Sequence, residues 1–295
     1  MLKYYIMIDF FWDYDIIKIG VIMGKIIAFA NQKGGVGKTT TCINDAAYIA
    51  AMGKTVLLID MDPQGNTTSG VGIDKSNKEL RTLYNVINKD IIIDEAIYPT
   101  CVEDLDIIPA TVDLAGAEID LVQMHSREHV VKNALARVKD KYDFIFIDCP
   151  PSLGLLTVNA LTAADSVIIP IQCQFYALEG LTQLMNTIKL IIHHLNPDLK
   201  IEGVVLTMKD NRSNLVQQVS DEVKKFFNKK VFDTYIPQNI RLAEAPSHGL
   251  PIMLYDTNSK GANAYQNLAE EILERNSQSY KKITKFTKIK VRSEK

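Results

Sequence analysis

Short apolar runs alternate with longer amphipathic stretches along most of the chain. The apolar runs cover residues 25–31, 55–60, 105–109, 143–148, 166–171, 201–207 and 231–236. Continuous runs of this length are typical of strands buried on both faces. The stretches between them predict helices over residues 38–52, 114–123, 128–140, 155–164, 178–195, 214–227 and 262–275. This order predicts an α/β fold with a doubly wound, mostly parallel sheet and helices on both faces.

The first 22 residues are apolar and aromatic but are interrupted by charges such as Asp9, Asp13 and Lys18. A secretory signal needs an unbroken apolar centre, and a membrane span needs about 20 apolar residues. Because Met23 directly precedes the first apolar run, we interpret residues 1–22 as a non-native extension upstream of the natural start. A genuine edge strand or helix is the alternative. Residues 23–276 are expected to form a single domain, since they contain neither an internal repeat nor a low-complexity linker.

Composition and charge narrow the classes of function. The chain is 47% hydrophobic and 23% charged, which excludes a mainly disordered protein. With 33 basic and 35 acidic side chains its net charge is -2, so contact with DNA or a membrane must use a local patch. Residues 277–295 are expected to form a separate basic tail. The four cysteines lie far apart, which favours a reducing cytoplasm over a disulfide framework or a metal cluster.

The loop after the first apolar run has the pattern of a phosphate-binding loop. This phosphate loop, residues 31–40, reads NQKGGVGKTT and lies between a predicted strand and a predicted helix. Glycines let the backbone approach a polyphosphate, and a helix amino terminus favours negative charge. Lys38 is expected to neutralise β and γ phosphate oxygens, and the Thr39 hydroxyl to ligate Mg²⁺. The ATP-binding residues predicted here are Lys33, Gly34, Gly35, Val36, Gly37, Lys38, Thr39 and Thr40.

Carboxylates follow two later apolar runs. Asp60 and Asp62 follow VLLI, and either can place an oxygen near an attacking water. Asp148 ends the run FIFID, a Walker B pattern, and is expected to hold a water bound to Mg²⁺. Paired aspartates at a strand end are more often turn formers, and one apolar run ending in Asp is weak evidence. The three loops in this order together indicate an ATPase.

The string K-G-G-x-G-K-[ST], which begins at Lys33, resembles the deviant Walker A family of dimeric ATPases. That family includes partitioning ATPases of the ParA and Soj type, the MinD division-site ATPase and the nitrogenase iron protein. The resemblance implies that Lys33 reaches across a nucleotide-sandwich dimer to phosphates bound by the other subunit. The string D-x-D-P-Q-G-N is similar to the ParA/Soj branch, which implies that Asp62 positions the hydrolytic water.

Two later segments are also similar to the ParA/Soj branch. Residues 236–247 resemble I-P-x-N-x-R-L-x-E-A-P-S, which implies that Pro237 and Asn239 line an adenine pocket. A plain loop-to-helix cap is the alternative. Residues 210–215 resemble the segment that carries nonspecific DNA contacts together with the Arg241 position. The resemblance therefore implies DNA binding by Arg212 and Arg241, and it extends over residues 25–276.

The resemblance implies a cytoplasmic, nucleoid-associated ATPase that forms a homodimer on ATP binding and then binds double-stranded DNA nonspecifically. A ParB-like centromere-binding partner would stimulate hydrolysis to segregate chromosome or plasmid DNA, without stable membrane association.

A MinD-like membrane-cycling ATPase is the alternative function. Such a protein is expected to contain the string D-x-D-x-G-L-R-N and an amphipathic carboxy-terminal membrane helix. The basic tail resembles such a helix weakly, because Ile283, Phe286 and Ile289 lie among its lysines. An iron-sulfur reductase would need cysteines arranged to bridge two subunits. Cys149 and Cys173 do not form that pattern. A small-molecule kinase would lack Lys33 and the D-P-Q-G-N turn.

Overall fold

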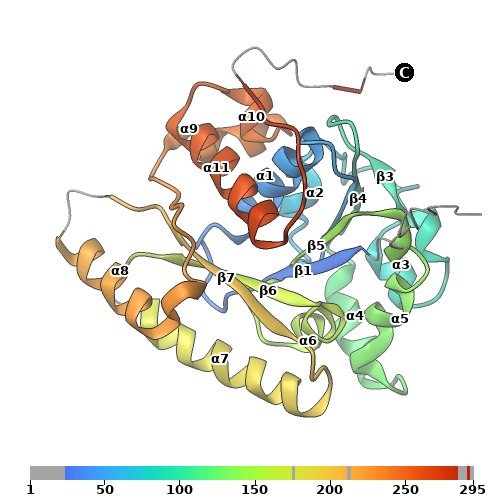
Figure 1. Ribbon diagram of the computed structural model, residues 1–295. Coiled ribbons are helices and arrows are strands. Elements are labelled where there is room, and N and C mark those ends of the chain that lie inside the picture. The colour runs from blue at the N-terminus through green and yellow to red at the C-terminus, as the bar shows by residue number, and fades with distance from the viewer. Residues whose placement is uncertain (1–23, 175–176, 211–213, 285–290, 293–295) are drawn as a thin grey trace, which may run out of the picture.

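The computed structural model describes residues 24–174, 177–210, 214–284 and 291–292 (Figure 1). A seven-stranded sheet has the order β3-β4-β2-β5-β1-β6-β7. Its strands are β1 Lys25–Phe29, β2 Val56–Asp60, β3 Tyr98–Pro99, β4 Leu105–Ile108, β5 Phe144–Asp148, β6 Ser166–Gln172 and β7 Lys200–Thr207. Only β3 runs antiparallel to its neighbour. The predicted doubly wound, mostly parallel sheet is confirmed, while the extension over residues 1–22 lies outside the described residues.

Helices cover both faces of this sheet (Figure 1). They are α1 Lys38–Ala51, α2 Asn66–Gly70, α3 Leu83–Ile87, α4 Leu114–Val122, α5 Val130–Leu135, α6 Leu155–Ala163, α7 Ala177–His194, α8 Asn214–Phe227, α9 Ile240–Glu244, α10 Ile252–Tyr255 and α11 Lys260–Arg275. Alternate residues of β1 enter two separate cores: Ile26 lies in the core under α3 to α8, and Ile27 in the core under α1 and α11. Both faces of the strand are therefore buried, as its unbroken apolar run predicts.

Residues 231–236 do not form the predicted strand. In the described chain this segment makes one isolated bridge, which joins Val204 to Val231. The ring of Phe232 lies against Gly203 of β7, where an added Cβ would approach ring carbon Cε2 to 2.3 Å. Phe232 also packs under the guanidinium of Arg275. The segment therefore follows the outer edge of β7 through a few backbone hydrogen bonds, too few for a regular strand, and its apolar side chains are buried by packing.

The helix predicted over residues 128–140 is also wrong in extent. The segment contains the six-residue helix α5 between short 3₁₀ turns at Arg127–His129 and Lys139–Lys141. The amide of Asn159 donates to the carbonyl of Arg127 and accepts from the N–H of Val131. In a continuous helix the N–H of Val131 would donate to the carbonyl of Arg127. Both groups bond to Asn159 instead, so the helix is interrupted at this point.

Strand register brings the three motif loops to one edge of the sheet. Phe29, at the end of β1, is the register partner of Asp148, and so is Asp60 at the end of β2. The phosphate loop therefore emerges beside both acidic loops. In a parallel sheet the carboxyl ends of the strands are the usual place for a ligand.

The described tail residues contact the domain. The N–H of Lys281 donates to the carbonyl of Met52 at the end of α1, and Ile283 packs against the core under α11. Farther on, the guanidinium of Arg292 lies 2.9 Å from a carboxylate oxygen of Asp106 in β4. The separateness of the basic tail remains a prediction, but these contacts hold parts of it against α1 and β4.

Asp45 is a buried carboxyl group inside α1. Neither of its oxygens has a hydrogen-bond partner among the described residues, and the residue is fully buried. Burial raises the pKa of Asp45 well above its ordinary value. The folded protein thus holds this proton at pH values where the unfolded chain releases it, so the group costs stability as the pH rises above about 4.

We expect Asp45→Asn to unfold at higher urea concentration than the wild type at neutral pH. The gain in unfolding free energy should be about 1–3 kcal/mol, because an amide needs no proton on folding, whereas the buried carboxylate must take one up. Between pH 4 and 7 the wild-type curve should fall relative to the variant by at most about 1.4 kcal/mol per pH unit. Urea titrations at several pH values measure this difference. Parallel stability curves would show that Asp45 does not hold its proton in the folded state.

Candidate functional site

The phosphate loop leaves its backbone amides open to a ligand. Gly35 and Gly37 have φ values of 72° and 85°, in the left-handed region that glycine favours. Gly37 directly precedes α1, and no side chain caps this helix. A hydrogen bond from the hydroxyl of Thr207 in β7 to the carbonyl of Val36 fixes the loop backbone against the sheet. Uncapped amides at the start of a 14-residue helix form an anion-binding site.

The two lysines of the loop have different surroundings. Lys38 is buried, and its Nζ donates to the carbonyl of Lys33 over 3.4 Å. Burial lowers the pKa of Lys38, while the nearby charges of Asp148 and Asp62 oppose that shift. Lys33 is only partly buried, and its Nζ donates to Oε1 of Gln174 just beyond β6, at 2.9 Å on the exposed side. The amino group of Lys38 therefore lies inside the loop, whereas that of Lys33 is accessible from solvent.

Asp148 joins two structural elements through one oxygen. Its Oδ2 accepts hydrogen bonds from the hydroxyls of Thr39 at 2.7 Å and Thr67 at 2.6 Å. Its Oδ1 is buried and has no partner among the described residues. Burial raises the pKa of Asp148 to about 6, against the lowering effect of both threonines. The predicted Thr39–Asp148 pair is thus brought together at the end of β5.

The oxygen donors at this point fit Mg²⁺. The free oxygen of Asp148 and the hydroxyl of Thr39 are hard ligands of the kind that Mg²⁺ prefers. Within the described ranges, no group of three or more His, Cys, Asp or Glu side chains is placed to hold a metal ion. The site therefore suits an ion held partly by nucleotide phosphates and water, not a metal enclosed by protein ligands.

The two carboxylates after β2 differ in what they contact. Asp60 is fully buried, and its Oδ2 accepts from both the N–H and the hydroxyl of Thr68. Burial raises the pKa of Asp60 to about 7. Asp62 lies nearer the surface, and its Oδ1 accepts from the N–H of Gln64. Asp60 supports the start of α2, which leaves Asp62 as the more accessible of the two.

A hollow of about 1070 Å³ lies beyond the carboxyl end of β7. Its lining includes Lys209 and Pro237, and the N–H of Lys209 donates to the carbonyl of Ile236. Asn239 instead caps the next helix, since its Oδ1 accepts from the N–H of Arg241 at 2.8 Å. Pro237 therefore lines this hollow, whereas Asn239 has the position of a helix cap.

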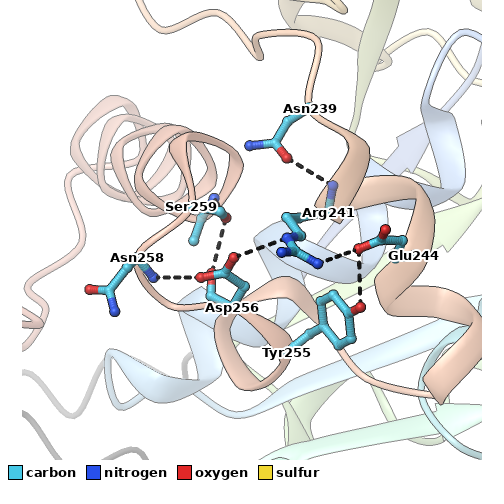
Figure 2. Close-up of polar contacts among 8 residues, drawn as sticks. Asn239, Arg241, Glu244, Tyr255, Asp256, Asn258 and Ser259 are labelled. Carbon is cyan, nitrogen blue, oxygen red and sulfur yellow. Dashed lines mark hydrogen bonds and ion pairs between the residues drawn. The ribbon is translucent and has the colours of Figure 1, made fainter.

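Of the two candidate DNA-binding residues, the structure describes Arg241 alone. Arg212 falls outside the described residues. Arg241 is exposed on α9, and its guanidinium forms ion pairs with Glu244 and Asp256 (Figure 2).

Several residues of the site were not singled out by the sequence patterns. Thr67 and Thr68 support Asp148 and Asp60, and their adjacent hydroxyls directly after D-P-Q-G-N were the available signal. Asn31 fixes the loop by donating to the carbonyl of Pro170 and accepting from the N–H of Lys33. Thr207 carried no recognisable signal, because its role depends on β7 lying two strands away from β1 in the sheet.

Comparison with known proteins agrees with this geometry. Residues 24–201 match the family model described as an AAA domain. The chain is 61% identical over 250 residues to the sporulation initiation inhibitor protein Soj of Bacillus subtilis, covering 85% of this chain and 98% of that protein. It is 52% identical over 255 residues to the chromosome partitioning protein ParA of Myxococcus xanthus, covering 86% and 90%. A solved structure of cobyrinic acid a,c-diamide synthase from Mycobacterium smegmatis with bound ADP and magnesium has a TM-score of 0.76 at 36% identity, covering 86% and 96%.

The parallel sheet, the uncapped phosphate loop and the paired lysines define a P-loop ATPase of the deviant Walker A class. Within that class, the chain belongs to the ParA/Soj family of partitioning ATPases.

Proposed function

We propose that the protein is an ATP-hydrolysing dimeric switch that binds DNA nonspecifically in its ATP-bound state and segregates chromosome or plasmid DNA. A ParB-like centromere-binding protein would stimulate its hydrolysis, in the cytoplasm at the nucleoid. The observation that carries the proposal is the exposed Nζ of Lys33 beside the buried Nζ of Lys38. A loop that holds phosphates with one lysine and presents a second outward suits a site completed by another subunit. The 61% identity to Soj supports the same function.

In this proposal the chain binds ATP with Mg²⁺ at the phosphate loop, which supplies electrostatic stabilisation of the transferred phosphoryl group. Gly34 to Thr40 would surround the phosphates. Pro237 and Asn239 would lie on the adenine side, Asn239 through its amide nitrogen, because its oxygen caps α9. The Thr39 hydroxyl would ligate Mg²⁺, and Asp148 would hold a water molecule bound to the ion. The related diamide synthase structure contains ADP and magnesium, which supports this cofactor pair.

Asp62 orients the attacking water in the proposed hydrolysis. Its carboxylate is fixed by the turn to Gln64 and lies on the same edge as Asp148. Lys33 of the second subunit would then stabilise charge on the phosphoryl group, the task of an arginine finger in other enzymes.

DNA binding would use Arg212 and Arg241 from both subunits, which places four cations against the phosphate backbone. We expect the logarithm of the binding constant to fall against the logarithm of salt concentration with a slope of about -3 to -4. Fluorescence anisotropy with labelled duplexes and a nonhydrolysable ATP analogue measures this slope. Affinity should vary little among duplexes of equal length, because phosphate contacts carry no sequence information directly.

Arg212→Ala and Arg241→Ala should each flatten the slope without lowering the affinity for ATP, since neither belongs to the phosphate loop. The full chain should not sediment with anionic vesicles when the ATP analogue is bound. Across the described parts of the chain, no helix has both the length and the apolar character needed to cross a membrane. Sedimentation with vesicles in the absence of DNA binding would overturn the partitioning function and favour the MinD-like alternative.

A further inference from the structure

Two acidic side chains engage two of the three guanidinium nitrogens of Arg241 (Figure 2). Its Nη1 lies 2.9 Å from Oε2 of Glu244, the last residue of α9. Its Nε lies 3.5 Å from Oδ2 of Asp256, at the end of α10. Arg241, Glu244 and Asp256 are called the Arg241 clamp below.

Both carboxylates of the clamp are held in place by further contacts. The hydroxyl of Tyr255 donates to the same Oε2 of Glu244 at 3.1 Å. The other oxygen of Asp256 accepts from the N–H of Asn258, just before α11. Figure 2 shows the two carboxylates on either side of the guanidinium, each with its further contact. The acidic groups are thus fixed by neighbouring elements and not by Arg241 alone.

The clamp carries a net charge of -1, because two carboxylates face one guanidinium. A hydrogen bond from Arg241 is the largest cause of the lowered pKa of Glu244, so this carboxylate stays ionised at neutral pH. Carboxylate and phosphate oxygens bind guanidinium in the same way, through charge-assisted hydrogen bonds. A DNA phosphate that approaches Arg241 therefore meets two competing acceptors and a net repulsion.

We infer that Glu244 and Asp256 weaken the binding of DNA by Arg241, because a phosphate at the guanidinium must compete with both carboxylates. The inference rests on the proposed role of Arg241 in DNA binding. Exposed ion pairs of this kind are weak, and so the exchange is accessible to DNA. The clamp limits the affinity of each subunit for DNA and thereby keeps the complex easy to release.

The test compares Glu244→Gln and Asp256→Asn with the wild type, using a nonhydrolysable ATP analogue and a labelled 30-base-pair duplex. Each variant removes one charge but keeps an oxygen that can accept a hydrogen bond, so Asp256→Asn preserves the contact with the N–H of Asn258. We expect each to bind DNA about three- to tenfold more tightly at the same salt concentration. Melting temperature and ATP affinity should stay unchanged.

The control for net charge is Glu270→Gln on α11, whose side chain contacts Gln266 and not Arg241. It should change DNA affinity less than twofold. A double-mutant cycle with Arg241→Ala then isolates the clamp. In that background, Glu244→Gln should improve DNA binding less than twofold, because no guanidinium remains to be released.

Three results would overturn the clamp. These are wild-type-like or weaker binding by both carboxylate variants, an equal gain from Glu270→Gln, and an undiminished gain in the Arg241→Ala background. In each case DNA binding by the wild type would leave the proposed function standing. If neither the wild type nor the carboxylate variants bind DNA, the proposed function and the clamp both fail.

Discussion

Replacing Lys38 by alanine should weaken ATP binding by at least about 100-fold, whereas Lys33→Ala should change it by no more than about threefold. Lys38 lies buried against the loop backbone, where it would neutralise the phosphates bound by its own subunit. The Nζ of Lys33 is on the exposed side and contacts Gln174, so its phosphate partner would lie on another subunit. Isothermal titration calorimetry with a nonhydrolysable ATP analogue measures both affinities.

The same pair of variants separates binding from turnover. Lys33→Ala should hydrolyse ATP at less than about a tenth of the wild-type rate, because a trans cation that stabilises developing charge is lost. Lys132→Ala, on the exposed surface of α5, is a matched control that should alter neither quantity. An Lys33→Ala variant that hydrolyses ATP normally would disprove the role of Lys33 across the dimer. Equal loss of ATP binding by both loop variants would do so as well.

Asp62→Ala should bind ATP, hydrolyse it at least about 100-fold more slowly than the wild type, and accumulate as a dimer. Only the positioning of water is lost, because the hydroxyl of Thr39, Asp148 and both lysines remain in place. Size-exclusion chromatography with ATP and a phosphate-release assay measure the two effects.

The control for local structure is Asp62→Asn, which keeps an oxygen that can accept from the N–H of Gln64. It should show the same slow hydrolysis and the same dimer, since it lacks the negative charge. Normal turnover by Asp62→Asn would indicate that the turn, not the carboxylate, is what hydrolysis needs. A monomeric Asp62→Ala that still binds ATP would contradict the proposed switch.

The sequence was sufficient to predict the central strands and the convergence of their loops. β1, β2 and β5 are buried on both faces, so each is a continuous apolar run that ends at a recognisable motif. Parallel pairing then requires Phe29, Asp60 and Asp148 to lie at the same edge. The phosphate loop and its acidic partners were accessible to prediction because local pattern and sheet geometry point to the same place.

Other features depend on contacts between distant residues. Residues 231–236 have the composition of a strand, but Phe232 packs over Gly203 and the segment pairs with β7 only at isolated points. The ion pair of Arg241 with Asp256 joins α9 to α10, and the motif that contains Arg241 carries no sign of it. Thr67 contacts Asp148 across 81 residues of sequence. Such pairs become visible only when the chain is folded.

The position of β1 within the sheet has a consequence for synthesis of the protein on the ribosome. Although β1 is made early, its two neighbours are β5 and β6, so that Lys25 pairs with Phe144 and Ile27 with Ser166. The first apolar strand must therefore wait for more than 100 further residues before it gains either partner. Since long-range parallel pairing is slow and exposes strand edges, the nascent chain should depend on chaperone protection during this interval. The contact between Thr39 and Asp148 likewise can form only after β5 has emerged.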